Sequence, residues 1–200
     1  MSPRRPLPAP SHYLVRLGED AGRQVLLVDG VVQSISPHDG EADGGYWAAM
    51  VPPARPRRAL ILGLGGGTLA RLLLDRWGSD VRILGIDDDV AVLETARAAG
   101  WLDIPETTVE IADAFAFVRQ CRQRFDYIAV DLYRADTFVG RSLTKPVLQR
   151  LRQLLEPGGW LAVNLFVDAY LPRRIARIAA VFDVDSRIPV GGNLVVRARR

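Results

Sequence analysis

The chain has 200 residues, of which 48% are hydrophobic and 24% charged, and its formal net charge is +3. This balance excludes a disordered or fibrous chain and predicts one globular domain with a small appendage. A single cysteine, Cys121, excludes an intramolecular disulfide and fits a reducing compartment. The first residues lack the apolar core of a signal peptide, and no apolar run is long enough to span a bilayer. We therefore expect a cytoplasmic protein with no membrane partner.

Arginines are concentrated in four places along the chain: residues 55–58, 119–124, 173–177 and 197–200. A nucleic-acid footprint is one interpretation of such clusters. No aromatic stacking platform is interleaved with them, so we favour solvated helix faces and chain ends. Nucleic acid is not the expected partner.

The N-terminal quarter of the chain predicts an arm and a small β appendage. Residues 1–10 are rich in proline and are expected to form a disordered arm. The appendage, residues 11–55, contains apolar runs typical of strands and one helical turn. The expected strands are residues 12–17, 24–29 and 31–35, with a turn at 18–22 and the helical turn at 46–50.

From residue 56 to residue 200 the chain predicts a second, larger domain in which strands and helices alternate. Alternation with short links indicates a mostly parallel sheet covered on both faces, hence an α/β, Rossmann-like fold. The expected strands are residues 59–63, 81–86, 108–112, 126–131 and 160–166. The expected helices are residues 68–77, 89–99, 114–123, 144–155 and 168–180. A closing antiparallel hairpin, residues 182–187 and 193–197, brings the predicted sheet to seven strands.

A glycine-rich loop containing Gly63, Gly65 and Gly67 follows the first strand of this domain. Such a loop lets a backbone approach a nucleotide, and the helix after it offers free N–H groups. Asp87 stands about 20 residues further on, at a strand end, where an acid accepts hydrogen bonds from ribose hydroxyls. Thr68 replaces the last glycine of a dinucleotide fingerprint, which makes an NAD-dependent dehydrogenase a distant alternative. A tight turn with a solvated acid is the simpler structural alternative.

Two further acids, Asp113 and Asp131, follow the next two predicted strands. The carboxyl ends of parallel strands line one crevice, so we expect both acids to meet Asp87 there. Asp113 could equally serve as a helix cap. Asp131 has the stronger functional claim, because residues 132–140 predict no helix and could carry a substrate loop.

These features together resemble the class I S-adenosylmethionine-dependent methyltransferase fold. The details are similar to its spermidine synthase (polyamine aminopropyltransferase) branch. The resemblance rests on the acids already named and on the following segments: Val28-Asp29-Gly30-Val31-Val32-Gln33, Tyr46 to Met50, Arg71, Ile86-Asp87-Asp88-Asp89-Val90, Ala112-Asp113-Ala114-Phe115 and Leu155-Glu156-Pro157-Gly158-Gly159.

The resemblance implies a nucleotide cofactor, either S-adenosylmethionine or its decarboxylated form, and a small-molecule acceptor. It implies a set of cofactor-binding residues: Gly63, Gly65, Gly67, Asp87, Asp88, Asp113, Ala114 and Gln33. Asp131 would accept a proton from an attacking amine, which needs a free lone pair to displace a thioether. Tyr46, Tyr133 and Arg134 are the expected substrate residues.

Three departures from the branch bear on the reaction. Gly66 stands where the branch has an aspartate for the cofactor ammonium, and Arg134 where it has a second acid. Trp47 and Ala48 stand where it has histidine and glutamate. Without the loop acid, backbone N–H groups would suit the carboxylate of the intact cofactor. Aminopropyl and methyl transfer therefore both stay open, and so does a nucleotide-binding module without catalysis.

The remaining expectations concern metals, core and assembly. His12 and His38 lie on different elements, so we expect no metal site. Trp101, Trp160, Tyr127 and Phe182 are expected in the core, and Cys121 is expected to pack on a helix face. A small sheet with an open edge and an apolar face predicts a homodimer built through the N-terminal hairpin.

Overall fold

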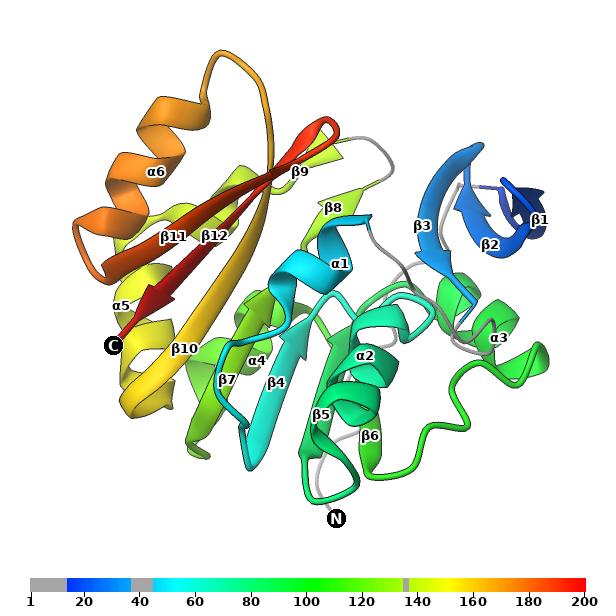
Figure 1. Ribbon diagram of the computed structural model, residues 1–200, viewed down its shortest axis with the longest axis horizontal. Helices are drawn as coiled ribbons and strands as arrows, with labels where there is room; N and C mark the ends of the chain where they lie inside the picture. The colour runs from blue at the N-terminus through cyan, green and yellow to red at the C-terminus, as the bar shows by residue number, and fades with distance from the viewer. Residues whose placement is uncertain (1–13, 37–44, 135–136) are drawn as a thin grey trace.

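A seven-stranded sheet forms the centre of the protein, which is described here from a computed structural model covering residues 14–36, 45–134 and 137–200. The arm predicted at residues 1–10 lies outside these ranges. The strand order is β11-β12-β10-β7-β4-β5-β6 (Figure 1). The strands are β4 (Arg58–Leu62), β5 (Arg82–Asp87), β6 (Thr107–Ile111), β7 (Phe125–Val130), β10 (Leu155–Phe166), β11 (Asp183–Val190) and β12 (Asn193–Arg199). Strands β4 to β7 and β10 run parallel, and β11 and β12 form an antiparallel hairpin. The predicted fold class is confirmed.

Helices cover both faces of this sheet because alternate residues of each central strand point to opposite sides. Ala59 and Ile61 of β4 face one hydrophobic cluster, whereas Leu60 and Leu62 face the other. The first cluster packs against α1 (Gly45–Met50), α2 (Thr68–Trp77) and α3 (Val90–Ala98). The second packs against α4 (Ala114–Gln120), α5 (Lys145–Leu154) and α6 (Leu171–Ala179). The predicted core residues, Trp101, Tyr127, Trp160 and Phe182, are all buried, and so is Cys121.

A separate three-stranded antiparallel sheet precedes the main one: β1 (Val15–Asp20), β2 (Arg23–Val28) and β3 (Val31–Ile35). The turn was expected at residues 18–22, but residues 18–20 belong to β1. The turn is only Ala21 and Gly22, both with positive φ, as two-residue hairpin turns require. Leu26 and Val28 of β2 join the first core cluster, which fixes this small sheet to the main one.

Two other predicted boundaries are wrong. Strand β10 begins at Leu155 rather than at residue 160, and its pairing with β7 shifts register between Leu155 and Trp160. A bulged stretch can keep glycine and proline inside a strand, where the composition alone indicates a loop. Likewise β11 continues through Pro189 and Val190, so the hairpin turn is shorter than expected. Helices α3 to α6 are each shorter than the predicted ranges.

The segment after β7 contains a small hairpin. Its strands are β8 (Tyr133–Arg134) and β9 (Thr137–Phe138), followed by a 3₁₀ turn, η1 (Gly140–Leu143). Leu132 accepts a hydrogen bond from the Val139 amide at 3.0 Å, which closes the base of the hairpin. The hairpin is thereby held directly beside the end of β7.

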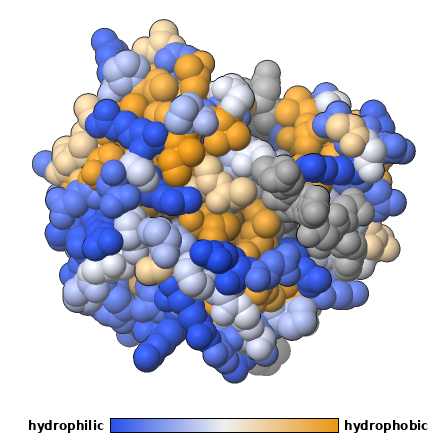
Figure 2. All heavy atoms as spheres, viewed as in Figure 1, coloured by the Kyte–Doolittle hydropathy of each residue, from blue (hydrophilic) through white to orange (hydrophobic). Residues whose placement is uncertain are grey.

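Helix α1 is fixed to the main sheet at its carboxyl end by two side chains. The buried Tyr127 hydroxyl donates to the Met50 carbonyl at 2.7 Å. Arg197 Nε donates to the Ala49 carbonyl at 2.8 Å. On the face shown in Figure 2, hydrophobic residues gather over α1 and β11, whereas the starts of β4 and β5 are covered by hydrophilic ones. Within the described ranges, no helix is both long and apolar enough to cross a membrane.

Candidate active site

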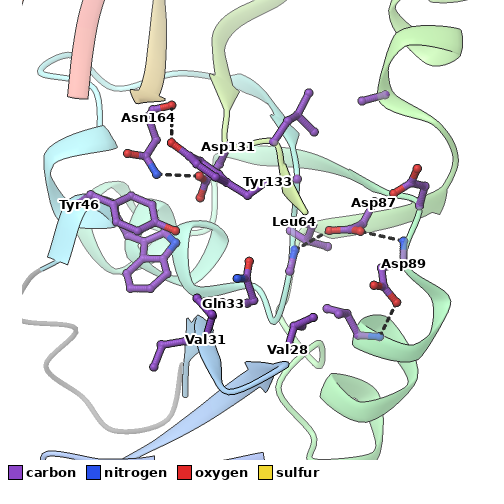
Figure 3. Close-up of a pocket in the computed structure, with 18 of the residues that line it drawn as sticks. Val28, Val31, Gln33, Tyr46, Leu64, Asp87, Asp89, Asp131, Tyr133 and Asn164 are labelled. Carbon is purple, nitrogen blue, oxygen red and sulfur yellow. Dashed lines mark hydrogen bonds between the residues drawn. The ribbon is translucent and has the colours of Figure 1, made fainter. Parts of the chain in front are cut away.

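A cavity of about 340 Å³ lies at the carboxyl ends of β4, β5, β7 and β10. Strand β4 has β5 on one side and β7 on the other, so the order of the parallel strands reverses here. Crevices at such switch points are where open α/β sheets bind ligands. Val28 at the end of β2, with Val31 and Gln33 of β3, contributes the opposite wall (Figure 3). The cavity is therefore shared between the two sheets.

The glycine loop approaches β7 more closely than any side chain would permit. A Cβ atom on Gly63 would lie 2.0 Å from the Asp131 carbonyl oxygen, and Gly63 has a φ of 88°. The Asp131 amide in turn donates to the Leu62 carbonyl at 2.9 Å. Glycine at position 63 is thus required to bring Asp131 beside the loop.

The backbone N–H groups of residues 63–67 all donate within the protein, so the loop itself has no amide free for a ligand. The acceptors are the Ile86 carbonyl for Gly63 and Leu64, Asp87 Oδ2 for Gly65, Ser34 Oγ for Gly66 and the Leu64 carbonyl for Gly67. The loop offers close approach to a ligand, but from residue 63 to residue 67 it offers no free donors to an anion.

Three hydrogen bonds hold strand β3 against this loop and the first residue of α2. The Gly66 amide donates to Ser34 Oγ at 2.7 Å. The Ile35 amide donates to Thr68 Oγ1 at 3.0 Å, and the Thr68 hydroxyl donates to the Ile35 carbonyl at 2.7 Å. A Cβ atom on Gly66 would lie 2.9 Å from both Ser34 Cβ and Trp101 Cε3. An acidic side chain at position 66 would therefore need β3 to move.

Asp87 closes the other side of the loop. Its Oδ2 accepts from the Gly65 amide at 2.8 Å and its Oδ1 from the Asp89 amide at 3.0 Å. Burial raises the pKa of Asp87 to about 6, although these two donors oppose the shift. Asp88 and Asp89 also line the cavity, and Asp89 caps α3. We call Asp87, Asp88 and Asp89 the acidic side of the cavity.

Asp131 lies across the cavity from Asp87, at the end of β7 (Figure 3). Its Oδ1 accepts from Asn164 Nδ2 at 2.9 Å, and its carboxylate also accepts from the Tyr46 hydroxyl and the Trp47 indole. Asn164 Oδ1 accepts from Asn193 Nδ2 at 2.9 Å, which fixes the Asn164 amide. Burial raises the pKa of Asp131 to about 6 despite its three donors, and the nearby charge of Asp87 adds to the shift.

Aromatic rings surround Asp131 in two pairs. Tyr46 and Trp47 of α1 have centroids 4.2 Å apart, and Tyr133 meets Phe166 edge-on at 4.7 Å. The Tyr133 hydroxyl donates to the Asn164 carbonyl at 3.1 Å, so this ring is held in place. Burial and the neighbouring carboxylate raise the pKa of the Tyr46 hydroxyl, which stays a donor. We call Tyr46, Trp47, Asp131, Tyr133, Asn164 and Phe166 the aromatic side of the cavity.

The structure brings most of the predicted site residues to one cavity. Those that line it are Gly63, Gly65, Asp87, Asp88, Ala114, Gln33, Tyr46, Tyr133 and Asp131. Asp113 is not among the lining residues, and its Oδ1 caps α4 by accepting from the Ala116 amide at 2.7 Å. Gly67 is the N-cap of α2, and a Cβ atom on it would meet Leu102 and Ile104; it does not line the cavity. Arg134 lies in β8, where its side chain is outside the described part of the chain.

Several lining residues were not singled out from the sequence as site residues, among them Asn164, Phe166 and Asn193. The sequence does indicate that Asn164 is unusual, because it is a polar residue within the apolar run of β10. In the structure its side chain is buried, with 1% exposed. A polar side chain buried in a central strand needs a partner, and its partner here is Asp131. Trp47 was noted only as a departure from the branch, and no sequence pattern indicated its contact with Asp131.

This fold and this site define the class of protein. A glycine loop after the first parallel strand, an acid after the second and a closing antiparallel hairpin give it the class I methyltransferase fold. The structure of human methyltransferase-like protein 13 in complex with SAH is similar, with a TM-score of 0.64, 20% identity and coverage of 76% of this chain and 73% of that chain.

The chain belongs to the Spermine/spermidine synthase domain family, whose sequence profile matches residues 19–164. A probable polyamine aminopropyl transferase of Bifidobacterium longum is 31% identical over 139 residues, which are 67% of this chain. The chain spans only 30% of the length of that relative. The crystal structure of a probable spermidine synthase from Corynebacterium glutamicum is similar with a TM-score of 0.77 and 19% identity, covering 99% of this chain and 81% of that chain.

Proposed function

We propose that this protein transfers an aminopropyl group from decarboxylated S-adenosylmethionine to an amine. The observation that carries the proposal is the charge of the cavity wall. Four aspartates, Asp87, Asp88, Asp89 and Asp131, line the cavity, and the described lining residues include no lysine or arginine. A cationic sulfonium and an amine suit such a wall, whereas a carboxylate does not.

The glycine loop supports the decarboxylated cofactor over the intact one. A free carboxylate would need a basic side chain or unpaired N–H groups. The N–H groups of residues 63–67 already have acceptors, and the nearest carboxylate to the loop is Asp87, bound to the Gly65 amide. The pairing of these amides disfavours the intact S-adenosylmethionine that the glycine at position 66 suggests in the sequence.

The two sides of the cavity have separate roles in this proposal. The acidic side, with Gly63, Gly65 and Ala114, would hold the nucleoside, and Asp87 would accept hydrogen bonds from the ribose hydroxyls. Gln33 would hold it from the β3 wall. The aromatic side would hold the amine, with Tyr46 and Tyr133 as walls.

Asp131 would act as the general base. The amine nitrogen forms a bond to the propyl carbon, the carbon–sulfur bond breaks, and its electron pair neutralises the sulfonium to give methylthioadenosine. The proton that the amine must lose goes to the Asp131 carboxylate. A carboxyl pKa near 6 leaves this group ionised at neutral pH while making it a better proton acceptor than an exposed carboxylate.

The test is a product assay with purified protein. Incubation with decarboxylated S-adenosylmethionine and a mixture of amines should release methylthioadenosine, detected by chromatography. Formation of S-adenosylhomocysteine from the intact cofactor, with no methylthioadenosine, would favour methyl transfer. Calorimetric binding of either nucleoside without turnover of any kind would favour a non-catalytic module.

We also infer a homodimer built through the N-terminal sheet. Strand β1 is an edge of that sheet; Leu17 within it is 40% exposed, and Leu14 just before it is 65% exposed. Exposed leucines beside an open strand edge support self-association. Light scattering at micromolar concentration should give the mass of two chains, and the mass of one chain would contradict the inference.

A further inference from the structure

Two asparagine side chains connect Asp131 to the C-terminal hairpin. Asn164 Nδ2 donates to Asp131 Oδ1 at 2.9 Å, and Asn193 Nδ2 donates to Asn164 Oδ1 at 2.9 Å. Asn164 lies in β10, whereas Asn193 is the first residue of β12. Both line the cavity. The two hydrogen bonds therefore form a chain of amides that ends at the proposed general base.

The charged end of this chain determines which way each amide is turned. An ionised carboxylate only accepts hydrogen bonds, so Asn164 has to present its Nδ2 to Asp131. The two ends of a primary amide have nearly the same shape, so packing alone does not choose between them. Because Asn164 is buried, its Oδ1 needs a donor from within the protein. Asn193 supplies that donor.

Strand pairing holds Asn193 in place from both sides. It pairs with Phe166 of β10 and with Val190 of β11. The Val167 amide donates to the Gly192 carbonyl at 3.0 Å, which joins the hairpin turn to the end of β10. The donor for Asn164 therefore comes from a paired strand and not from a loose loop, and this favours a fixed geometry at Asp131.

From this geometry we propose that Asn193 is a positioning residue: it keeps the Asn164 amide turned so that an N–H group points at Asp131. The proposal rests on the proposed function, in which Asp131 accepts the proton of the amine. Without Asn193 the buried Asn164 Oδ1 would lose its donor, and a buried acceptor without a donor is unfavourable. The amide would then rotate away, and Asp131 would lose a donor that stabilises its ionised form.

Other titratable groups interact with Asp131, and the test has to account for them. Within the described part of the chain they are Tyr46 of α1, Tyr127 of β7, Tyr133 of β8 and Asp87 at the end of β5. Burial raises the pKa of each tyrosine hydroxyl, so all three stay protonated at neutral pH. Burial raises the pKa of Asp87 to about 6, in the same range as that of Asp131. A comparison with the Asp131→Asn variant separates the two carboxylates.

The test uses Asn193→Leu, which removes the donor and keeps a similar shape, so that water does not replace the lost amide. The value of kcat/KM is measured against pH by release of methylthioadenosine, with decarboxylated S-adenosylmethionine and the amine turned over fastest in the product assay. The rise near pH 6 should move to higher pH by about 0.5 unit or more, which lowers kcat/KM about threefold on the acidic side. An unmoved profile would overturn the proposal.

Two further variants separate positioning from a general defect of the hairpin. Gly192→Ala changes the neighbouring turn residue, where a Cβ atom meets nothing within 4 Å, and it should leave the pH profile unchanged. In this proposal Asn193 acts only through Asn164. Adding Asn193→Leu to Asn164→Ala should therefore move the profile no further than Asn164→Ala alone. A second shift of the same size in the double variant would contradict the proposal.

Urea unfolding follows the same titration without turnover. The stabilising contribution of Asp131 is lost as the pH rises through its folded pKa, so a higher pKa extends the loss to higher pH. The urea midpoint of Asn193→Leu, compared with that of Asn193→Leu/Asp131→Asn, should thus keep falling to higher pH than the same comparison without the leucine. Equal pH dependence would overturn the proposal. Absence of methylthioadenosine from the unmodified protein would instead reject the proposed function. If the leucine variant does not fold, Asn193→Val, with a side chain typical of strands, replaces it.

Discussion

Alanine at position 66 tests whether β3 and the glycine loop fit as tightly as described. The new Cβ would lie 2.9 Å from Ser34 Cβ and 2.9 Å from Trp101 Cε3, well inside ordinary van der Waals contact. Neither neighbour can yield easily, because both are 1% exposed and Ser34 is hydrogen-bonded to the loop. Overpacking of this kind costs about 2 kcal/mol, within a range of roughly 1–3 kcal/mol. For a chain of this length that corresponds to a melting temperature lower by about 4–8 °C.

The assay is thermal unfolding followed by circular dichroism, with Gly140→Ala as the matched control. A Cβ on Gly140 meets nothing within 4 Å, so this control should change stability by less than about 0.5 kcal/mol. Adding Ser34→Gly to Gly66→Ala removes one of the two close contacts. The double variant should therefore lose less stability than the sum of the single variants, by at least about 0.5 kcal/mol. Equal melting temperatures for the two alanine variants would refute the reasoning.

Four further outcomes follow from the site and its supports. Asp131→Asn should lower kcat at least about 100-fold with methylthioadenosine affinity unchanged in calorimetry; lost affinity would mean a structural role. The value of kcat/KM should rise through pH 6 as Asp131 ionises, and Asn164→Ala, by removing a donor that lowers this pKa, should move the rise to higher pH. Because the folded pKa of Asp131 is about 6, above its usual 3.8, its stabilising contribution is complete below about pH 3.8 and is lost as the pH rises through 6. The urea midpoint of the unmodified protein should thus fall relative to that of the Asp131→Asn variant between pH 4 and 7. Midpoints that change equally with pH in both proteins would contradict the raised pKa of Asp131. Tyr127→Phe leaves the Met50 carbonyl without its donor, so it should cost about 1–3 kcal/mol in thermal unfolding, and an unchanged melting temperature would argue against that bond.

The fold was predictable because its signals are local. Alternation of apolar runs with helical periods predicts a parallel sheet, and the glycines of the loop mark where the first strand must turn. The boundaries of β10 and β11 were harder to predict from the sequence, because Pro157 and Pro189 lie inside strands that long-range pairing stabilises. Tertiary pairing overrode the local preference in both places.

The site was predictable only as far as backbone topology determines it. Asp87 and Asp131 were expected together because the carboxyl ends of parallel strands line one crevice, and the two residues end the strands on either side of β4. The partners of the loop amides could not be predicted from the sequence. Ser34 lies 32 residues from Gly66, and only the packing of the two sheets brings them together. Asn193 reaches Asn164 through the register of β10 and β12, which pairs Asn164 with Val195, and no sequence pattern gives that register.

The hydrogen bonds between β3 and residues 66 and 68 make the formation of the pocket depend on docking of the N-terminal sheet. Both sheets contribute lining residues to the pocket, so a folded main sheet without the N-terminal sheet would leave the proposed nucleoside exposed to water on one side. Docking of β3 must also offset the entropy of closing the chain between residues 34 and 66. The complete pocket therefore forms only when residues 34 and 66 meet, and a nucleoside bound there, as in the proposed function, would stabilise the contact between the two sheets.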